Sequence, residues 1–219
     1  MSNVAQQIIE TSLCLLDACL LTGTAGNISA RCSDGESVLI TPSARDYRSL
    51  TEQDLVRVHL ALAKAEGRWK PSSEWRLHLT IYRARPDVNA IIHHHGIWAS
   101  MVAVARKTIP VLIDEAADIG PIPTAPYAPS GSAELAEAVA GELTKGSNAV
   151  LLANHGAVAV GQDLGEAMDR ALQVERLAKI YIGAEVLGGA HPLDEAAVRR
   201  SQQFLQDYRA ARAVHEPGL

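Results

Sequence analysis

The stretch Pro71–His95, PSSEWRLHLTIYRARPDVNAIIHHH, brings a carboxylate and a cluster of histidines close together in the chain. The run Val88–His93 is apolar and partly β-branched, which predicts a strand that continues into His94 and His95. Side chains two residues apart in a strand point the same way. We therefore expect His93 and His95 to share one face, where they can hold a single ion, and His94 to point to the other face.

A third imidazole follows another apolar run, AVLLAN, which predicts a strand that ends at His155. Three neutral imidazoles with an open fourth position are typical of a catalytic zinc, because a structural zinc is closed by four ligands. Glu74 opens the predicted helix EWRLHLTIYRAR, which leads into the histidine strand. Its carboxylate can serve as a fourth ligand or as a base. The other histidines are expected to be ordinary hydrogen-bonded residues: His59, His78, His94, His191 and His215.

Length and charge narrow the class of protein. The 219 residues are 47% hydrophobic and contain no linker-like tract, so we expect one domain over residues 1–219. The net charge is −5 and the basic residues are scattered. This pattern argues against nucleic acid or an anionic membrane as the main partner.

The lack of a recognisable targeting signal and the cysteine pattern lead us to expect a cytoplasmic protein. The N-terminal segment lacks a basic region followed by an apolar core, and no apolar run is long enough to span a bilayer. Cys14, Cys19 and Cys32 are odd in number and show no C-x-x-C spacing, which fits thiols in a reducing compartment.

Helical and strand periodicities alternate along the chain. Apolar spacing predicts a helix over residues 4–21 that ends at Gly23. We expect a turn at AKAEGRW and a buried strand over residues 109–113. Further helices are expected at 97–106, 132–144, 163–187 and 194–212, with a strand at 148–153. Several connections between strands are too short for helical crossovers. We therefore predict a three-layer α/β domain with a largely antiparallel central sheet flanked by helices.

Three loops lie where they can bind anions. GTAGNISAR, VLITPSAR and PSSEW place glycines, hydroxyls and backbone N–H groups at the ends of predicted elements. Clustered N–H dipoles and helix N-termini bind phosphate without lysine. The plainer interpretation is that these segments are turns and helix caps. Residues 114–132 form another long loop with four prolines and three acids, which is typical of a functional loop.

Taken together, the motifs GTAGNIS, ITPS, PSSEWRLH, IIHHHG, APYAPSGSAELAEAV and ANHG resemble the class II aldolase/adducin-head family, and within it the aldolases of fuculose 1-phosphate and related sugar phosphates. The resemblance implies Zn²⁺, or another divalent ion such as Mn²⁺ or Co²⁺, on His93, His95 and His155, with Glu74 as the acid/base. It also implies a homotetramer with active sites at subunit interfaces. The implied phosphate pocket consists of Gly26, Asn27, Ser43, Ser72 and Ser73.

The chain departs from the family pattern on the aldehyde side of the site. Asp114, followed by Glu115 and Asp118, stands where the resemblance places a tyrosine supplied by a neighbouring subunit. Ser130 replaces an aromatic of the aldehyde pocket, and Ala44 replaces a glycine of the phosphate loop. Phe204 and Tyr208 match a mobile aromatic tail of the family.

The resemblance implies an aldolase that cleaves a ketose 1-phosphate to dihydroxyacetone phosphate and a small aldehyde through an enediolate that the metal stabilises. The substrate is expected to resemble fuculose 1-phosphate or a deoxy- or alkylthio-pentulose 1-phosphate. Glu74 would exchange the proton on the enediolate carbon, with its pKa tuned upward from about 4.3. Asp114, Glu115 or Asp118 would take the hydroxyl proton of the departing aldehyde.

Three alternatives remain open at this point. A pentulose-5-phosphate 4-epimerase has a similar metal site and an acid that aligns with Asp118. Dehydration of a sugar phosphate is another possibility. An adducin-like head domain without catalysis differs in kind, and such heads lack the metal ligands that this chain retains.

Overall fold

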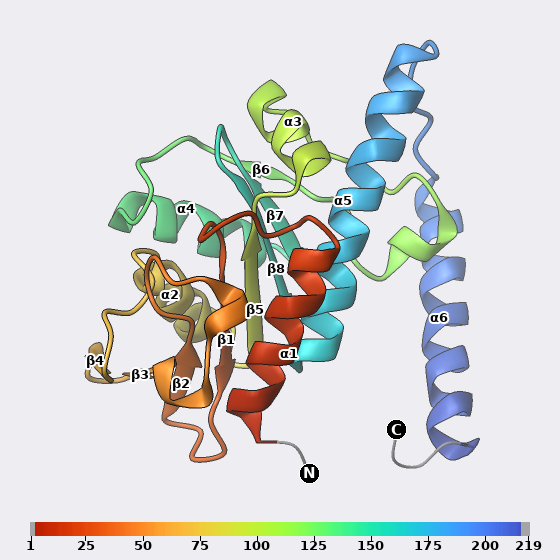
Figure 1. Ribbon diagram of the computed structural model, residues 1–219. Coiled ribbons are helices and arrows are strands. Elements are labelled where there is room, and N and C mark those ends of the chain that lie inside the picture. Colours follow the sequence, from red (N-terminus) through yellow and green to blue (C-terminus); the bar gives the residue numbers. More distant parts are fainter. Residues whose placement is uncertain (1–2, 216–219) are drawn as a thin grey trace.

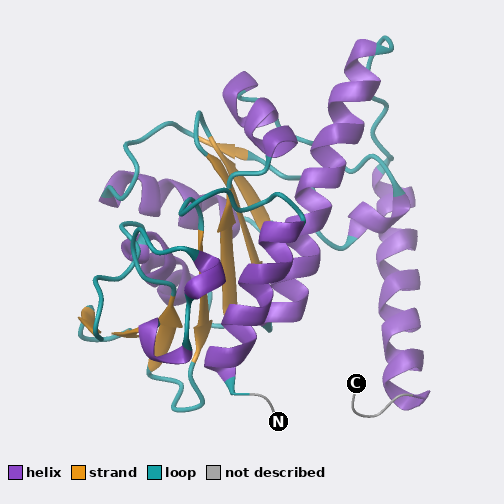
Figure 2. Ribbon diagram, viewed as in Figure 1, coloured by secondary structure: helices purple, strands orange, loops and turns teal. Residues whose placement is uncertain are grey.

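The computed structural model describes residues 3–215, with side chains as far as Tyr208. Its strands form one eight-stranded sheet in the order β4-β3-β2-β1-β5-β8-β7-β6, with helices on both faces (Figures 1 and 2). Every pairing between these described strands is antiparallel except that of β6 with β7. The strands are β1 Asn27–Arg31, β2 Ser37–Ile40, β3 Val56–His59, β4 Lys64–Glu66, β5 Ala90–His94, β6 Thr124–Ala125, β7 Ala149–Leu152 and β8 Gly156–Gly161.

Two hydrophobic cores sandwich the sheet. One face is covered by α1, α3 and α5, and the other by α2 and α4. The helices are α1 Val4–Asp17, α2 Trp75–Ala84, α3 Ile97–Ala105, α4 Ala133–Leu143, α5 Leu164–Val186 and α6 Glu195–His215, with short 3-10 helices η1 Tyr47–Ser49, η2 Glu52–Asp54 and η3 Asp114–Ala117. This arrangement confirms the predicted three-layer fold with a largely antiparallel sheet. None of the described helices is both long and apolar enough to cross a membrane.

Strand β5 lies near the centre of the sheet, between β1 and β8. Its side chains alternate between the two cores: Ile91 packs with α2 and α4, whereas Ile92 packs with α1 and α5. His93 has the parity of Ile91 and so faces the α2 side, while His94 faces the opposite layer. The register sets Asn27 opposite His93 on the neighbouring strand.

The structure corrects three local predictions. Helix α1 ends at Asp17 instead of residue 21, because Cys19 adopts a φ of 59°, which a helix cannot continue through. Residues 109–113 form no strand beyond a bridge from Ile109 to Ile122, since Pro110 offers no N–H to a ladder. The segment expected to turn at AKAEGRW contains the edge strand β4.

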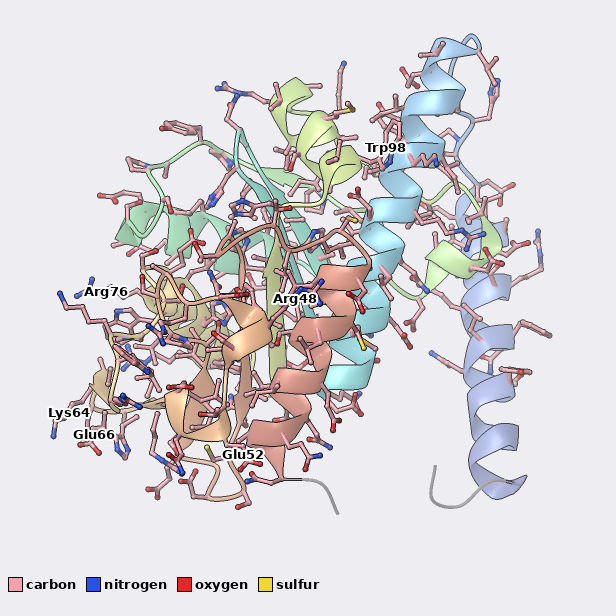
Figure 3. The ribbon with its side chains drawn as sticks, in the orientation of Figure 1. Arg48, Glu52, Lys64, Glu66, Arg76 and Trp98 are labelled. Carbon is pink, nitrogen blue, oxygen red and sulfur yellow. The ribbon has the colours of Figure 1, made fainter. Side chains whose placement is uncertain are left out.

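The edge strand β4 and its neighbour β3 were not predicted. β4 is short and exposed, and its Lys64 and Glu66 form an ion pair of 2.8 Å at the rim of the sheet (Figure 3). Charged, short edge strands resist pairing with other chains. β4 has little hydrophobic pattern for periodicity to detect, whereas β3 alternates the buried Val56 and Val58 with polar residues, a period-2 signal that the sequence analysis did not use.

Helix α6 stands apart from the sheet and packs against η3 (Figure 1). Both lie on the side of α5, whereas α2 lies on the opposite side of the molecule. The side chain of His215 lies outside the described residues.

Candidate active site

His93, His95 and His155 converge at the end of β5. The first two share a face of that strand, and His155 sits in the tight connection between β7 and β8, where Asn154 takes a φ of 59°. The ring centroids are 4.8 to 5.0 Å apart. Their candidate ligand atoms all lie within 4.8 Å of one another. The structure therefore brings together the three side chains expected to hold a metal.

The geometry of this cluster fits a cation. His93 Nδ1 lies 2.9 Å from the carbonyl oxygen of Ala157 and donates to it, which leaves Nε2 directed at the other members of the cluster. That Nε2 is 2.9 Å from both His95 Nε2 and an oxygen of Glu74. Two ring nitrogens and a carboxylate oxygen that converge at this distance can share one divalent ion. Burial, followed by the charge of His93, lowers the pKa of His95 to about 4, which keeps its ring neutral and ready to bind metal.

Glu74 is buried at the start of α2, next to the histidine cluster. Asn27 Nδ2 donates to Glu74 Oε2 at 3.3 Å, and Ser130 Oγ donates to Oε1 at 3.1 Å. Burial favours a raised pKa for this carboxyl, but the charges of His93 and His155 and the hydrogen bonds outweigh it and hold the pKa below its ordinary value. The expectation of an upward shift was therefore wrong, because partners that favour the charged form surround the carboxylate.

Sequence reasoning missed the polar residues behind Glu74. His78 Nε2 lies 2.5 Å from Asn27 Oδ1, and His78 Nδ1 lies 2.6 Å from Ser29 Oγ, which is 2.9 Å from the hydroxyl of Tyr82. His78 is fully buried and was expected to be an ordinary histidine. The sequence did contain a signal for this contact: His78 follows Glu74 by four residues, which places both side chains on one face of α2.

The phosphate-loop candidates lie on adjoining segments. The Ser72 N–H donates to the carbonyl of Thr41 and the Ser43 N–H to that of Lys70, at 3.1 and 3.0 Å, so the ITPS and PSS turns run side by side. The side chains of Ser43 and Ser73 are exposed, whereas Ser72 is buried and its hydroxyl accepts from the Glu74 N–H at 3.3 Å.

Two backbone positions in these loops need φ values that favour glycine. Gly26 has a φ of 81°, and a Cβ there would lie 2.7 Å from the carbonyl oxygen of His93. Ala44 takes a φ of 54°, so an alanine occupies a left-handed position. The side chain of Asn27 contacts Glu74 and His78.

The acidic loop does not meet the histidine cluster within the chain. Asp114 accepts a hydrogen bond from Ser201 on α6 at 2.7 Å, and Asp118 lies 3.6 Å from Arg170 on α5. Glu115 pairs with Arg176 at 3.1 Å. All three acids therefore pack on the α5 and α6 side, whereas the histidines face α2.

Comparison with known proteins identifies the family. Residues 6–182 match the family described as Class II Aldolase and Adducin N-terminal domain. The chain belongs to this family. The family expected from the sequence motifs is thereby confirmed.

Named relatives of the chain are aldolases. It is 41% identical over 183 residues to L-fuculose phosphate aldolase of Escherichia coli K12, which covers 83% of each chain. It is 37% identical to a 5-methylthioribulose-1-phosphate/5-deoxyribulose-1-phosphate aldolase of Escherichia coli O45:K1, over 86% of each chain. A solved structure of L-fuculose 1-phosphate aldolase superposes with a TM-score of 0.88 at 34% identity, covering 94% of this chain and 97% of the other.

Replacing His155 by Ala is expected to remove most of the bound divalent ion. The wild type should bind about one ion per chain, and two imidazoles on one strand would leave that ion mainly bound by water. Metal content after dialysis, measured by atomic emission, checks this expectation. His94→Ala is the matched control, because His94 faces the other layer, and it should retain wild-type metal content. Full occupancy in His155→Ala would show that the metal site was misassigned.

Proposed function

We propose that this class II sugar-phosphate aldolase uses Zn²⁺ to cleave a ketose 1-phosphate to dihydroxyacetone phosphate and a small aldehyde. The observation that carries the proposal is the position of the Glu74 carboxylate. It is buried beside the three-histidine cluster, with Oε2 at 2.9 Å from His93 Nε2, and it lies next to turns that present hydroxyl groups. The activities named for its relatives support it. An adducin-like head without catalysis would not need this arrangement.

The division of labour follows from the charge that the reaction creates. Breaking a carbon–carbon bond next to a ketone leaves an electron pair on carbon, which must be stabilised. Zn²⁺, held by His93, His95 and His155, would supply a Lewis acid for the oxygens at that carbon. Imidazole ligands such as these bind Zn²⁺ well, and Mn²⁺ or Co²⁺ would be alternatives at the same site.

Glu74 is placed to move the proton on the carbon that becomes part of dihydroxyacetone phosphate. Its lowered pKa keeps the carboxylate ionised, which is the form that can accept a proton. Ser130 and Asn27 each hold one carboxylate oxygen, which fixes the direction in which the base points. The turns that carry Gly26, Ser43, Ser72 and Ser73 would bind the substrate phosphate and so orient the reacting carbon.

The aldehyde half of the substrate is where this chain differs from the pattern that it resembles. Ser130 has a small, exposed side chain where the resemblance places an aromatic, and its hydroxyl is committed to Glu74. A smaller residue leaves room for a different aldehyde. We therefore favour a deoxy- or alkylthio-pentulose 1-phosphate alongside fuculose 1-phosphate as the substrate. A relative named 5-deoxy-D-ribulose 1-phosphate aldolase, from Bacillus thuringiensis serovar kurstaki, is 33% identical over 93% of this chain and 95% of its own length, and it supports this choice.

We also propose a homotetramer in the cytoplasm, with each site completed by a neighbouring chain. Large apolar side chains are exposed on α3, at the C-terminal end of α5 and midway along α6, as expected of a surface that other chains cover. They are Ile97, Met101, Val104, Val186, Leu187 and Phe204. The three cysteines are free thiols, which suits a reducing compartment.

A product assay on a panel of phosphorylated ketoses tests the proposal. The panel contains fuculose 1-phosphate, 5-deoxyribulose 1-phosphate, 5-methylthioribulose 1-phosphate and ribulose 5-phosphate. We expect release of dihydroxyacetone phosphate from at least one ketose 1-phosphate and no epimer of ribulose 5-phosphate. Formation of the epimer without dihydroxyacetone phosphate would replace the aldolase by the 4-epimerase.

A further inference from the structure

A zipper of polar side chains joins α2 to β1 behind Glu74. Glu74, His78 and Tyr82 are spaced four residues apart and share one face of α2. Asn27 and Ser29 are two apart and share one face of β1. Their side chains interleave in the order Glu74, Asn27, His78, Ser29, Tyr82, and each contacts the next at 2.5 to 3.3 Å. All five residues are at least nine-tenths buried.

The donors and acceptors of this zipper permit one arrangement at His78. Asn27 presents its NH₂ group to Glu74 Oε2 and its carbonyl oxygen, which only accepts, to His78 Nε2. His78 Nε2 must then donate. Burial, followed by the charge of His93, lowers the pKa of His78 to about 3, so the ring is neutral and Nδ1 accepts from Ser29. Ser29 in turn accepts from Tyr82.

We propose that His78 is a positioning residue, which as a neutral Nε2–H imidazole fixes the amide of Asn27 and through it the carboxylate of Glu74. Without the His78 donor, the Asn27 amide can turn over and place its carbonyl oxygen against the carboxylate. With His78 as donor, the side chain of Asn27 is thereby held toward the base. This inference rests on the proposed function, in which Glu74 is the base.

The tautomer of His78 can be observed without any assay of activity. Long-range ¹H–¹⁵N correlation spectra of the Zn²⁺-loaded wild-type protein should show His78 as the neutral Nε2–H tautomer, unchanged between pH 5 and pH 8. The signal is assigned by its absence from the spectrum of His78→Gln. A protonated ring or the Nδ1–H tautomer would overturn the inference, whether or not the protein proves to be an aldolase.

Kinetics separate a positioning role from phosphate binding. The reaction followed is exchange of solvent deuterium into dihydroxyacetone phosphate, which needs Glu74 but no aldehyde. His78→Leu removes the donor to Asn27 and should lower kcat of exchange about tenfold, the rate equivalent of one net hydrogen bond, with KM within about twofold of the wild type. His78→Gln retains an N–H donor and should recover most of that loss.

Tyr82→Phe is the matched control within the same buried zipper. It removes the outermost hydroxyl but leaves the Ser29 donor to His78, so kcat should stay within about threefold of the wild type. A raised KM with unchanged kcat in His78→Leu would assign Asn27 to the phosphate and overturn the inference. Equal losses in His78→Gln and His78→Leu, with folded protein by circular dichroism, would also overturn it. Absence of exchange in the wild type would instead count against the proposed function.

Discussion

Glu74→Ala is expected to keep the bound metal but to lose cleavage activity by ~10²-fold or more, the usual scale for removing a general acid or base. Its carboxylate lies 2.9 Å from His93, but we expect the three imidazoles to hold the ion without it. The cleanest measurement is exchange of solvent hydrogen into dihydroxyacetone phosphate, because this reaction isolates the proton transfer assigned to Glu74. Exchange at the wild-type rate would show that another group is the base.

Two further variants distinguish the charge of Glu74 from its packing. Glu74→Gln keeps the shape of the side chain but cannot accept a proton, so it should be about as inactive as Glu74→Ala. Ser130→Ala removes the hydrogen bond of 3.1 Å to Glu74 Oε1 and leaves the carboxylate in place. Its loss should stay within about tenfold, the rate equivalent of a single hydrogen bond. A Glu74→Gln variant with substantial exchange activity would contradict the role of general base.

The convergence of the histidines could be predicted because strand periodicity is a local rule. The parity of His93 and His95 on β5 follows from the apolar run before them, and the ladder then fixes which layer each side chain faces. Predicting the position of His155 required one further assumption, namely that its strand would lie near β5. The structure satisfies it through the β7–β8 hairpin, which places β8 beside β5.

The polar zipper behind Glu74 could not be predicted with the same confidence. Its α2 half is visible as a four-residue spacing, but its β1 half depends on how the helix docks on the sheet, which is a tertiary contact. The predicted direction of the Glu74 pKa shift was wrong for a similar reason. Burial alone raises the pKa of a carboxyl group, and only the three-dimensional structure shows that His93, His155 and Asn27 surround it.

Neutralising the responsible acid of the 114–118 loop is expected to depress complete cleavage by ~10²-fold while sparing proton exchange on dihydroxyacetone phosphate. The acid would take the hydroxyl proton of the aldehyde fragment, and exchange on dihydroxyacetone phosphate involves no aldehyde. Within one chain the loop packs on α5 and α6, so the acid must act in the site of a neighbouring subunit of the proposed tetramer.

Exposure favours Asp114 over Asp118 for this role. Asp114 is exposed and accepts a hydrogen bond from the hydroxyl of Ser201, whereas Asp118 is half-buried against Arg170 of its own α5. Asp114→Asn should therefore show the loss of cleavage. Ser201→Ala is the matched control, because it removes the contact of Asp114 within the chain but keeps the acid, and it should cleave at close to the wild-type rate. Asp118→Asn and Glu115→Gln complete the set, with thermal unfolding measured for Asp118→Asn because Arg170 loses a partner. Full cleavage of the true substrate in all three acid variants would show that these carboxylates only solvate the loop, and would leave the aldehyde proton to another group.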